Sequence, residues 1–464
     1  MSAYKKLINN SIVFALGNLG SKVVSFILVP FYTYYLTTEQ YGISDLLLTT
    51  VSLLVPIFFF SVYDAVLRFV LDSGYDNKRI LSNSLIIGLI GFIFSLVLLP
   101  LVLLTDFKPY VLHFYLILLF TFFQNLFGQY ARAKGYVRLF SLNGILLTAF
   151  LASFSILFIV VFHQGLTGFF WAQILAYLFS DVVLFLGSKA YKDISLKFIN
   201  RKEIKSLLSY SVPLIPNSVM WWIVNASSRY FILFFSGTYL TGLFAVASKL
   251  PALLGILNQI FMQAWQISAI EEKGAEESNT YYTTVFGAFA SLLFVITSML
   301  TIVIKFVFGI LFAPSYFSAW TVVPLLALGT VFSNFSAFIG TNYIVAKKTG
   351  GVFKTSVYGG IVSLLLNLIL IKVFGLIGAG LSAMISFYIV FILRYFDTRK
   401  FINMRIDWLQ IHGSVLLIIL QLVILSLNLT IVSTYLMQLA CFVVILYLNR
   451  GLFVQLLNKF IRKQ

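Results

Sequence analysis

Long apolar stretches, separated by short polar segments, recur along the chain from residue 8 to residue 448. A helix needs roughly 20 apolar residues, at about 1.5 Å of rise each, to cross the hydrocarbon core of a bilayer. The pattern therefore predicts an all-α integral membrane protein with about fourteen transmembrane helices. The predicted helices cover residues 8–35, 43–66, 80–104, 111–131, 139–162, 166–187, 207–235, 240–269, 281–304, 320–346, 353–373, 376–396, 411–428 and 431–448.

The composition leaves no room for a soluble catalytic domain. Of the 464 residues, 60% are hydrophobic and only 10% are charged, whereas soluble domains have about 25% charged residues. The longest hydrophilic segment, 188–206, is too short to fold as a domain. The chain has no P-loop motif, and no His pair or Cys cluster at metal-ligand spacing. We therefore expect no enzymatic activity, no metal site and no organic cofactor.

The distribution of charge predicts how the helices are oriented. The net charge is +17, which in a soluble protein would suggest nucleic acid as a partner. Here most Lys and Arg residues cluster in every second polar segment, so the positive-inside rule explains them better. This rule places both termini and residues 188–206 in the cytoplasm, and no nucleic-acid partner is expected.

A weak internal repeat predicts the domain organisation. Gly165-Leu166-Thr167-Gly168 opens the predicted sixth helix, and Gly375-Leu376-Ile377-Gly378 opens the twelfth. Two six-helix halves of parallel orientation would place such segments at equivalent positions, as in many transporters; convergent loop patterns are the alternative. The predicted domains are an N-terminal bundle (1–190), a cytoplasmic linker (191–206), a C-terminal bundle (207–400), and a helical hairpin with a basic tail (401–464).

Three cations lie well away from the ends of predicted helices: Lys22, Arg229 and Lys249. A charge at mid-bilayer costs roughly 2.5–3.5 kcal/mol, so such residues usually face a water-filled cavity. Few acids in the helices are available to neutralise them. We therefore interpret them as the wall of a cavity that binds an anionic substrate. The alternative is a purely structural role in contacts between helices.

Polar and aromatic residues share the helical faces of two of these cations. Asn18 lies one turn before Lys22, whereas Trp222 and Asn225 lie seven and four positions before Arg229. At these spacings the side chains project from one side of a helix. They are predicted to bind substrate together with the cations.

Acidic residues are scarce in the predicted helices. Asp64 and Arg68 are separated by four positions and are predicted to form an ion pair that latches or gates the inner end of the second helix. Asp181 lies in the inner third of the sixth helix and is predicted to take up a proton or pair with a cation. Asp45, at the start of the second helix, is expected to face water. If an H⁺ or Na⁺ gradient drives transport, Asp181 and Asp64 are the predicted carriers.

Two segments resemble a known transporter family. One is LGNLGSKVVSFILVPFYTYYLTTEQYGISDLLL, with SVYDAVLRF after it; the other is SYSVPLIPNSVMWWIVNASSRYFILFF, which leads into TGLFAVASKL. Over residues 5–400 the chain resembles Wzx-type oligosaccharide-repeat flippases of the multidrug/oligosaccharidyl-lipid/polysaccharide exporter superfamily. It departs from that pattern at Ser228, where many relatives have an acid.

The resemblance implies a function that the residues alone do not. Members of this family flip undecaprenyl-diphosphate-linked repeat units across the bacterial cytoplasmic membrane by alternating access, for O-antigen, capsule or teichuronic-type polymers. It also implies a polymerase and glycosyltransferases as partners. The alternatives are a multidrug or cation antiporter of the same superfamily, for which an acidic cavity is expected, and a non-transporting membrane scaffold.

Overall fold

The computed structural model describes residues 20–22, 24–72, 74–271, 278–346, 348, 350–427 and 429–451. These residues form helices and connecting turns, and none of them belongs to a β-strand. The predicted all-α membrane fold is confirmed. By contacts the chain divides into two compact units, Met1–Trp222 and Ile223–Gln464.

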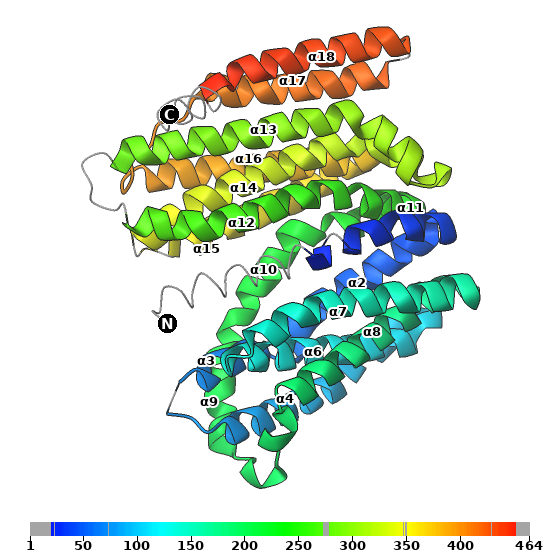
Figure 1. Cartoon of the computed structure of the whole chain (residues 1–464), viewed down its shortest axis with the longest axis vertical. Coiled ribbons are helices and arrows are strands. Elements are labelled where there is room, and N and C mark those ends of the chain that lie inside the picture. Colours follow the sequence, from blue (N-terminus) through cyan, green and yellow to red (C-terminus); the bar gives the residue numbers. More distant parts are fainter. Residues whose placement is uncertain are drawn as a thin grey trace, which may run out of the picture. The chain divides into compact units, whose positions relative to one another are not determined.

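The first unit contains eight α-helices of its own within the described part of the chain after residue 37 (Figure 1). Residues 24–35, before them, are also helical. The eight helices are α2 (Thr38–Phe58), α3 (Val62–Val70), α4 (Asn77–Ser95), α5 (Leu99–Leu103), α6 (Val111–Ala133), α7 (Val137–Ser155), α8 (Gly165–Gly187) and α9 (Arg201–Ser211). The next helix, α10 (Ile215–Ala226), contains the boundary between the units.

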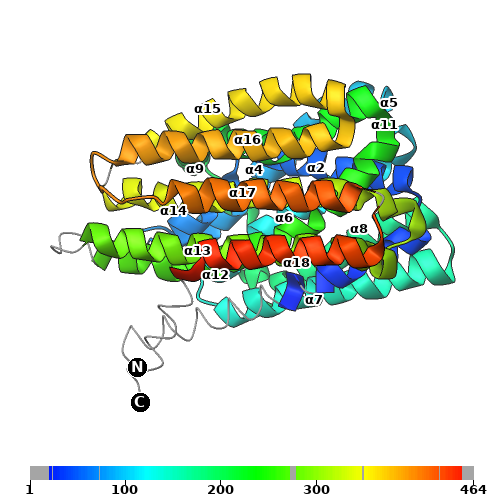
Figure 2. The same cartoon turned by 90° about the horizontal axis from the view of Figure 1, so that it is seen from above.

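The second unit packs its helices around α14, which is almost entirely buried. Stacked aromatic rings form much of this core: the Trp265 and Phe338 centroids lie 4.2 Å apart, as do those of Phe261 and Phe289. Its helices are α11 (Ser228–Ala247), α12 (Lys249–Glu271), α13 (Ser278–Leu311), α14 (Val323–Val345), α15 (Gly350–Leu366), α16 (Lys372–Thr398), α17 (Trp408–Ser426) and α18 (Ile431–Leu448). The last two run side by side next to α13 (Figure 2).

Twelve stretches of the described residues are long and apolar enough to cross a membrane. One of them, Gly350–Thr398, is 49 residues long, far beyond the roughly 20 residues that a single crossing needs. It bends at Gly375, where φ is +53°, and so corresponds to two predicted helices. The first predicted helix, 8–35, lies partly outside the described residues. When Gly350–Thr398 is counted as two crossings and the first predicted helix is added, the twelve stretches agree with the predicted total of about fourteen.

The two glycine segments of the predicted repeat have the same local geometry. Gly165 and Gly375 adopt φ of +52° and +53°, a left-handed conformation that glycine adopts without a steric penalty. Each follows a π-helical stretch, Ile156–Val161 in one unit and Asn367–Ile371 in the other. This shared geometry supports the internal repeat.

The division into units falls later than the predicted linker at 191–206. Residues 201–206 already belong to α9, which packs against α3 and α4 of the first unit. The preceding loop is also tied to α4, since Asn83 Nδ2 donates to the Phe198 carbonyl at 2.9 Å. Compactness does not define a functional domain, so the predicted domain boundaries stay a prediction.

Candidate functional site

Lys22 lies in the first unit, on the helical segment that precedes α2. It is half-buried. The turn before it packs on α7, because a methyl group at Gly20 would lie 3.6 Å from the Ile145 side chain. Asn18, the predicted partner on the same helical face, lies outside the described residues.

Arg229 lies in the second unit, directly after a break in the predicted seventh helix. The helix breaks at Ser227, between α10 and α11, so the predicted polar face is not carried by one continuous helix. Arg229 Nη1 donates to the Asn225 carbonyl at 3.3 Å, and its guanidinium lies 5.5 Å from the centre of the Phe244 ring. Carbonyl and aromatic contacts therefore hold this cation at the break.

Lys249 is the first residue of α12, in the second unit. Ser248 separates α11 from α12, and Pro251 follows in the first turn. Proline lacks a backbone N–H and is tolerated in the first turn of a helix. The chain is therefore interrupted beside Lys249, as it is beside Arg229.

Trp222 is fixed by a hydrogen bond within the first unit. Its indole Nε1 donates to the Thr49 carbonyl of α2 at 3.0 Å. The ring is partly exposed, and the neighbouring Trp221 is 65% exposed. This hydrogen bond sets the orientation of the Trp222 ring.

Asp181 is buried in the first unit. Its side chain lies on α8, and neither carboxylate oxygen has a hydrogen-bond partner in the described part of the chain. A polar chain lies beside it: Asn143 Nδ2 donates to Ser180 Oγ at 2.7 Å, and Ser180 Oγ donates to Gln124 Oε1 at 3.0 Å. A buried carboxylate without such partners is costly when ionised, which favours a bound proton or cation.

The predicted ion pair between Asp64 and Arg68 is wrong. Arg68 is exposed and pairs with Asp72 at 3.5 Å, whereas Asp64 is half-buried at the start of α3. Asp72 lies just beyond the end of α3 and, like Asp64, is four positions from Arg68, so the pair forms with the carboxylate that is 39% exposed at the surface. The gating role predicted for Asp64 and Arg68 stays a prediction.

Asp45 is also placed differently from the prediction. It is 8% exposed rather than facing water. The helix begins at Thr38, five residues earlier than predicted, because Thr37 and Gln40 form a reciprocal capping box. Asp45 therefore lies in the second turn and is packed inside the first unit.

Comparison with known proteins identifies the family. Residues 7–266, more than half of the chain, match the family described as polysaccharide biosynthesis protein. The chain belongs to this family. Two curated relatives are an uncharacterized membrane protein of Methanocaldococcus jannaschii, 26% identical over 54% of the chain and 51% of the relative, and the probable low-salt glycan biosynthesis flippase Agl15 of Haloferax volcanii, 25% identical over 47% of each. The chain spans about half the length of these curated relatives.

Solved structures show the same fold at low sequence identity. The lipid II flippase MurJ, in an inward closed conformation, has a TM-score of 0.68 with 14% identity, covering 96% of this chain and 99% of that one. An inward-facing multidrug resistance MATE family transporter of the MOP superfamily has a TM-score of 0.67 with 14% identity, covering 82% and 94%. The chain therefore has the fold of this superfamily of membrane transporters.

The structure adds a buried polar cluster that the sequence did not predict. Ser228 Oγ donates to Asn367 Oδ1 at 3.1 Å, and Asn367 Nδ2 donates to Ser227 Oγ at 3.3 Å. Ser227 is the residue at which α10 and α11 separate, and Asn367 begins the π-helical stretch before Gly375. The cluster thus joins two irregular helix segments of the second unit. An Asn within the apolar stretch 353–373 was the available signal.

Arg394 is a second residue whose environment the sequence did not predict. It lies near the end of the predicted helix 376–396, where an exposed charge is expected, but it is 9% exposed inside α16. Its guanidinium donates to the Ser336 carbonyl at 2.8 Å, Ser356 Oγ at 3.0 Å and Thr355 Oγ1 at 3.1 Å. It connects α14, α15 and α16 within the second unit.

Proposed function

We propose that this chain flips undecaprenyl-diphosphate-linked oligosaccharide repeat units from the cytoplasmic to the outer leaflet of a bacterial cytoplasmic membrane. Three findings support the proposal: the polysaccharide biosynthesis family, the relative named as a glycan biosynthesis flippase, and the fold shared with a lipid II flippase. The repeat unit would serve O-antigen, capsule or a teichuronic-type polymer. The protein would act as a transporter and not as an enzyme, with both termini in the cytoplasm.

The observation that carries the proposal is the setting of Arg229. A diphosphate loses strong hydration when it enters a low-dielectric space, and nearby cations offset that cost. Arg229 is held by the Asn225 carbonyl and the Phe244 ring at a break in its helix. Its planar guanidinium can bind phosphate oxygens in a bidentate manner. Lys22 and Lys249 are the other cations predicted to bind the diphosphate.

Other predicted residues would contact the sugar. Trp222 offers an aromatic face whose orientation is fixed by the Thr49 carbonyl, and aromatic faces pack on the apolar sides of sugar rings. Asn225 and Asn18 would donate hydrogen bonds to hydroxyl groups. Alternating access would then expose this site to one side of the membrane at a time.

Coupling to an ion gradient would use the buried acids. Asp181 has no hydrogen-bond partner for its carboxylate in the described part of the chain, so a proton or Na⁺ would complete it. Asp64, half-buried near the inner end of its helix, is the second candidate, with the neighbouring Arg68 contributing to a gate. No organic cofactor is needed.

A multidrug or cation antiporter is the second candidate function, because the fold is shared with a MATE transporter. Cationic drugs require carboxylates in the cavity, whereas the predicted site is basic. A non-transporting scaffold is the third candidate. Helix breaks beside Arg229 and Lys249 would have no function in a scaffold.

The flippase proposal also implies membrane lipid, glycosyltransferases and a polysaccharide polymerase as partners, and no nucleic acid.

The test is complementation of a strain that lacks its own repeat-unit flippase. Arg229→Glu should abolish polymer export, Arg229→Lys should retain part of it, and Lys22→Ala and Lys249→Ala should each reduce it. Lys197→Ala, in an exposed loop, serves as the matched control and should be silent. Membrane abundance of each variant is measured in parallel. Normal export by well-expressed variants of all three cations would contradict the anion site.

A further inference from the structure

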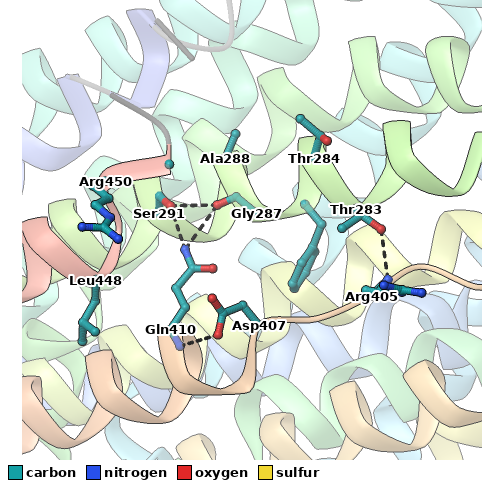
Figure 3. A pocket seen from close by; sticks show the side chains of 12 residues that line it. Thr283, Thr284, Gly287, Ala288, Ser291, Arg405, Asp407, Gln410, Leu448 and Arg450 are labelled. Atoms are coloured by element: carbon teal, nitrogen blue, oxygen red, sulfur yellow. Dashed lines mark hydrogen bonds between the residues drawn. The ribbon is translucent and has the colours of Figure 1, made fainter. Parts of the chain in front are cut away.

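A cavity of about 400 Å³ lies where the C-terminal hairpin, α17 and α18, packs against α13 within the second unit (Figure 3). It is lined by the first turns of α13, the segment before α17, the first turn of α17 and the end of α18. Small-molecule sites commonly have volumes of about 300–1,000 Å³. The cavity is therefore large enough for the polar part of a small ligand.

The floor of the cavity is a fixed hydrogen-bonded network. Gln410 Nε2 donates to Ser291 Oγ at 2.7 Å and to Asn449 Oδ1 at 2.8 Å. Asn449 Nδ2 in turn donates to Ser414 Oγ at 3.0 Å. These bonds join α13, α17 and the end of α18, so the floor is preorganised.

One wall is positioned by backbone hydrogen bonds. The Arg405 backbone N–H donates to Thr283 Oγ1 at 3.0 Å, and the Asn403 N–H donates to Asn279 Oδ1 at 2.9 Å. Both acceptors lie in the first turns of α13. The segment before α17 is thereby fastened to α13, with the Arg405 side chain at the edge of the cavity.

The mouth of the cavity is positively charged. Arg405 and Arg450 line it and are exposed, and neither forms a salt bridge within the described residues. The one carboxylate of the lining, Asp407, accepts a hydrogen bond from the Gln410 backbone N–H at 3.0 Å and caps α17. Arg405 and Arg450 lie on opposite sides of the lining (Figure 3), and guanidiniums bind phosphate groups well.

The cavity lies at helix ends, where a bilayer surface is expected. α17 begins at Trp408 and α18 ends at Leu448, and tryptophan is typical of the membrane interface. Next to the opening, the side chains of Leu409 and Tyr447 are 74% and 62% exposed. An occupant with an anionic head and an apolar tail would match both the mouth and this apolar surface.

We propose that this cavity binds the phosphate headgroup of an anionic phospholipid from the predicted cytoplasmic leaflet. The phosphate lies between Arg405 and Arg450, and the acyl chains follow the apolar surface of α17 and α18. The bound lipid links the hairpin to α13. This site is independent of the proposed substrate site, because it uses none of its residues.

Native mass spectrometry of the purified full chain tests the proposal, with phosphatidylglycerol and phosphatidylcholine as probes. The wild type should retain phosphatidylglycerol in preference to phosphatidylcholine. The Arg405→Gln, Arg450→Gln double variant should bind phosphatidylglycerol at least about tenfold more weakly, because two charge-assisted contacts are lost. The matched control is Arg399→Gln, Lys400→Gln, which removes the same charge from an exposed site outside the cavity and should change affinity less than twofold.

A second variant controls for the possibility that the Arg405→Gln, Arg450→Gln double variant misfolds. Ala288→Phe fills the cavity from α13 and leaves both arginines in place, so it should also abolish the preference for phosphatidylglycerol. Equal losses in the two glutamine double variants would overturn the proposal in favour of general surface electrostatics. Displacement of the lipid by millimolar inorganic phosphate would show that the cavity takes a free anion and would overturn the lipid assignment.

Discussion

One buried and one half-buried cation of the second unit, Arg394 and Lys305, are held by neutral groups. Arg394 donates to one carbonyl and two hydroxyl groups. Lys305 donates to the Leu425 carbonyl and lies 4.5 Å from the centre of the Trp320 ring. Carbonyls and aromatic rings leave a cation's charge in place, whereas a carboxylate would cancel it. At the residue scale, this explains how a basic protein keeps charge inside apolar helices.

Replacing Arg394 should destabilise the second unit. In Arg394→Ala, three acceptors lose their donor and a void forms, for an expected loss of about 2–4 kcal/mol in the free energy of unfolding. Arg394→Lys should lose less than Arg394→Ala, because its ammonium still donates to some of the three acceptors and its side chain fills part of the void. Thermal unfolding of the purified protein measures both effects. Arg399→Ala, at the exposed C-cap of the same helix, is the control, and an equal shift there would contradict the argument.

Glycine turns join consecutive helices in the same way in both units. After Gly375 the chain returns so closely that a methyl group on Gly378 would lie 2.0 Å from the Leu370 carbonyl oxygen. A methyl group on the corresponding Gly168 would lie 3.0 Å from the Phe158 carbonyl oxygen. At the scale of elements, the repeated motif is thus a tight helical hairpin. It requires glycine at the turn, Gly165 or Gly375, and again three residues later, at Gly168 or Gly378.

Gly378→Ala should therefore cost about 3 kcal/mol or more, since the obstructing atom is backbone and cannot move away by a rotamer change. Gly168→Ala, with its longer contact, should cost less. Gly309→Ala is the control: it lies inside α13 with open space around it, and it should be neutral or stabilising by up to about 1 kcal/mol. Comparable melting temperatures for the Gly378 and Gly309 variants would refute the tight-hairpin interpretation.

The predicted cytoplasmic loop 188–200 is anchored by Asp193. Its carboxylate accepts hydrogen bonds from Lys134 Nζ at 2.5 Å and from the Tyr130 hydroxyl. Burial disfavours the ionised form, but the hydrogen bonds from Lys134 and Tyr130 outweigh it and hold the pKa of Asp193 below its ordinary value of 3.8. The anchor is therefore complete above about pH 4 and is lost as the pH falls through the lowered pKa.

Limited proteolysis of this loop should follow that titration. Asp193→Asn should expose the loop to protease at pH 7, where the wild type is protected, and the difference should shrink below about pH 4 as the wild-type carboxylate is protonated. An acid-active protease permits both measurements. A difference between the two proteins that stays constant across this range would exclude the Asp193 anchor.

At the scale of the whole molecule, the membrane topology is the first property to test. Reporter fusions should place residues 188–206 and the C-terminal segment in the cytoplasm and residues 105–110 outside. The prediction depends on an even number of helices, with Gly350–Thr398 crossing the membrane twice. A C-terminal reporter located outside would contradict the even number of membrane crossings.

The sequence predicted the fold well but the contacts poorly. Apolar length and loop charge are sufficient to predict membrane helices, and the two glycine segments pointed to the repeat. The Asp64–Arg68 pair was predicted from spacing alone, which cannot choose between Asp64 and Asp72, because each of them lies four positions from Arg68. The breaks at Ser227 and Ser248 were also missed. The break at Ser227 lies beside tertiary hydrogen bonds to Asn367, one from Asn367 to Ser227 and one from Ser228 to Asn367, which local sequence does not contain.

The central claim is that the chain itself moves a lipid-linked diphosphate across a bilayer. The most direct measurement uses the purified protein in proteoliposomes with an undecaprenyl-diphosphate-linked oligosaccharide, and follows the exposure of the sugar to an added glycosidase. The account predicts that the wild type exposes the inner-leaflet sugar at least about tenfold faster than empty liposomes, and that Arg229→Glu does not. A wild-type rate equal to that of empty liposomes, under an imposed H⁺ or Na⁺ gradient as well as without one, would contradict it.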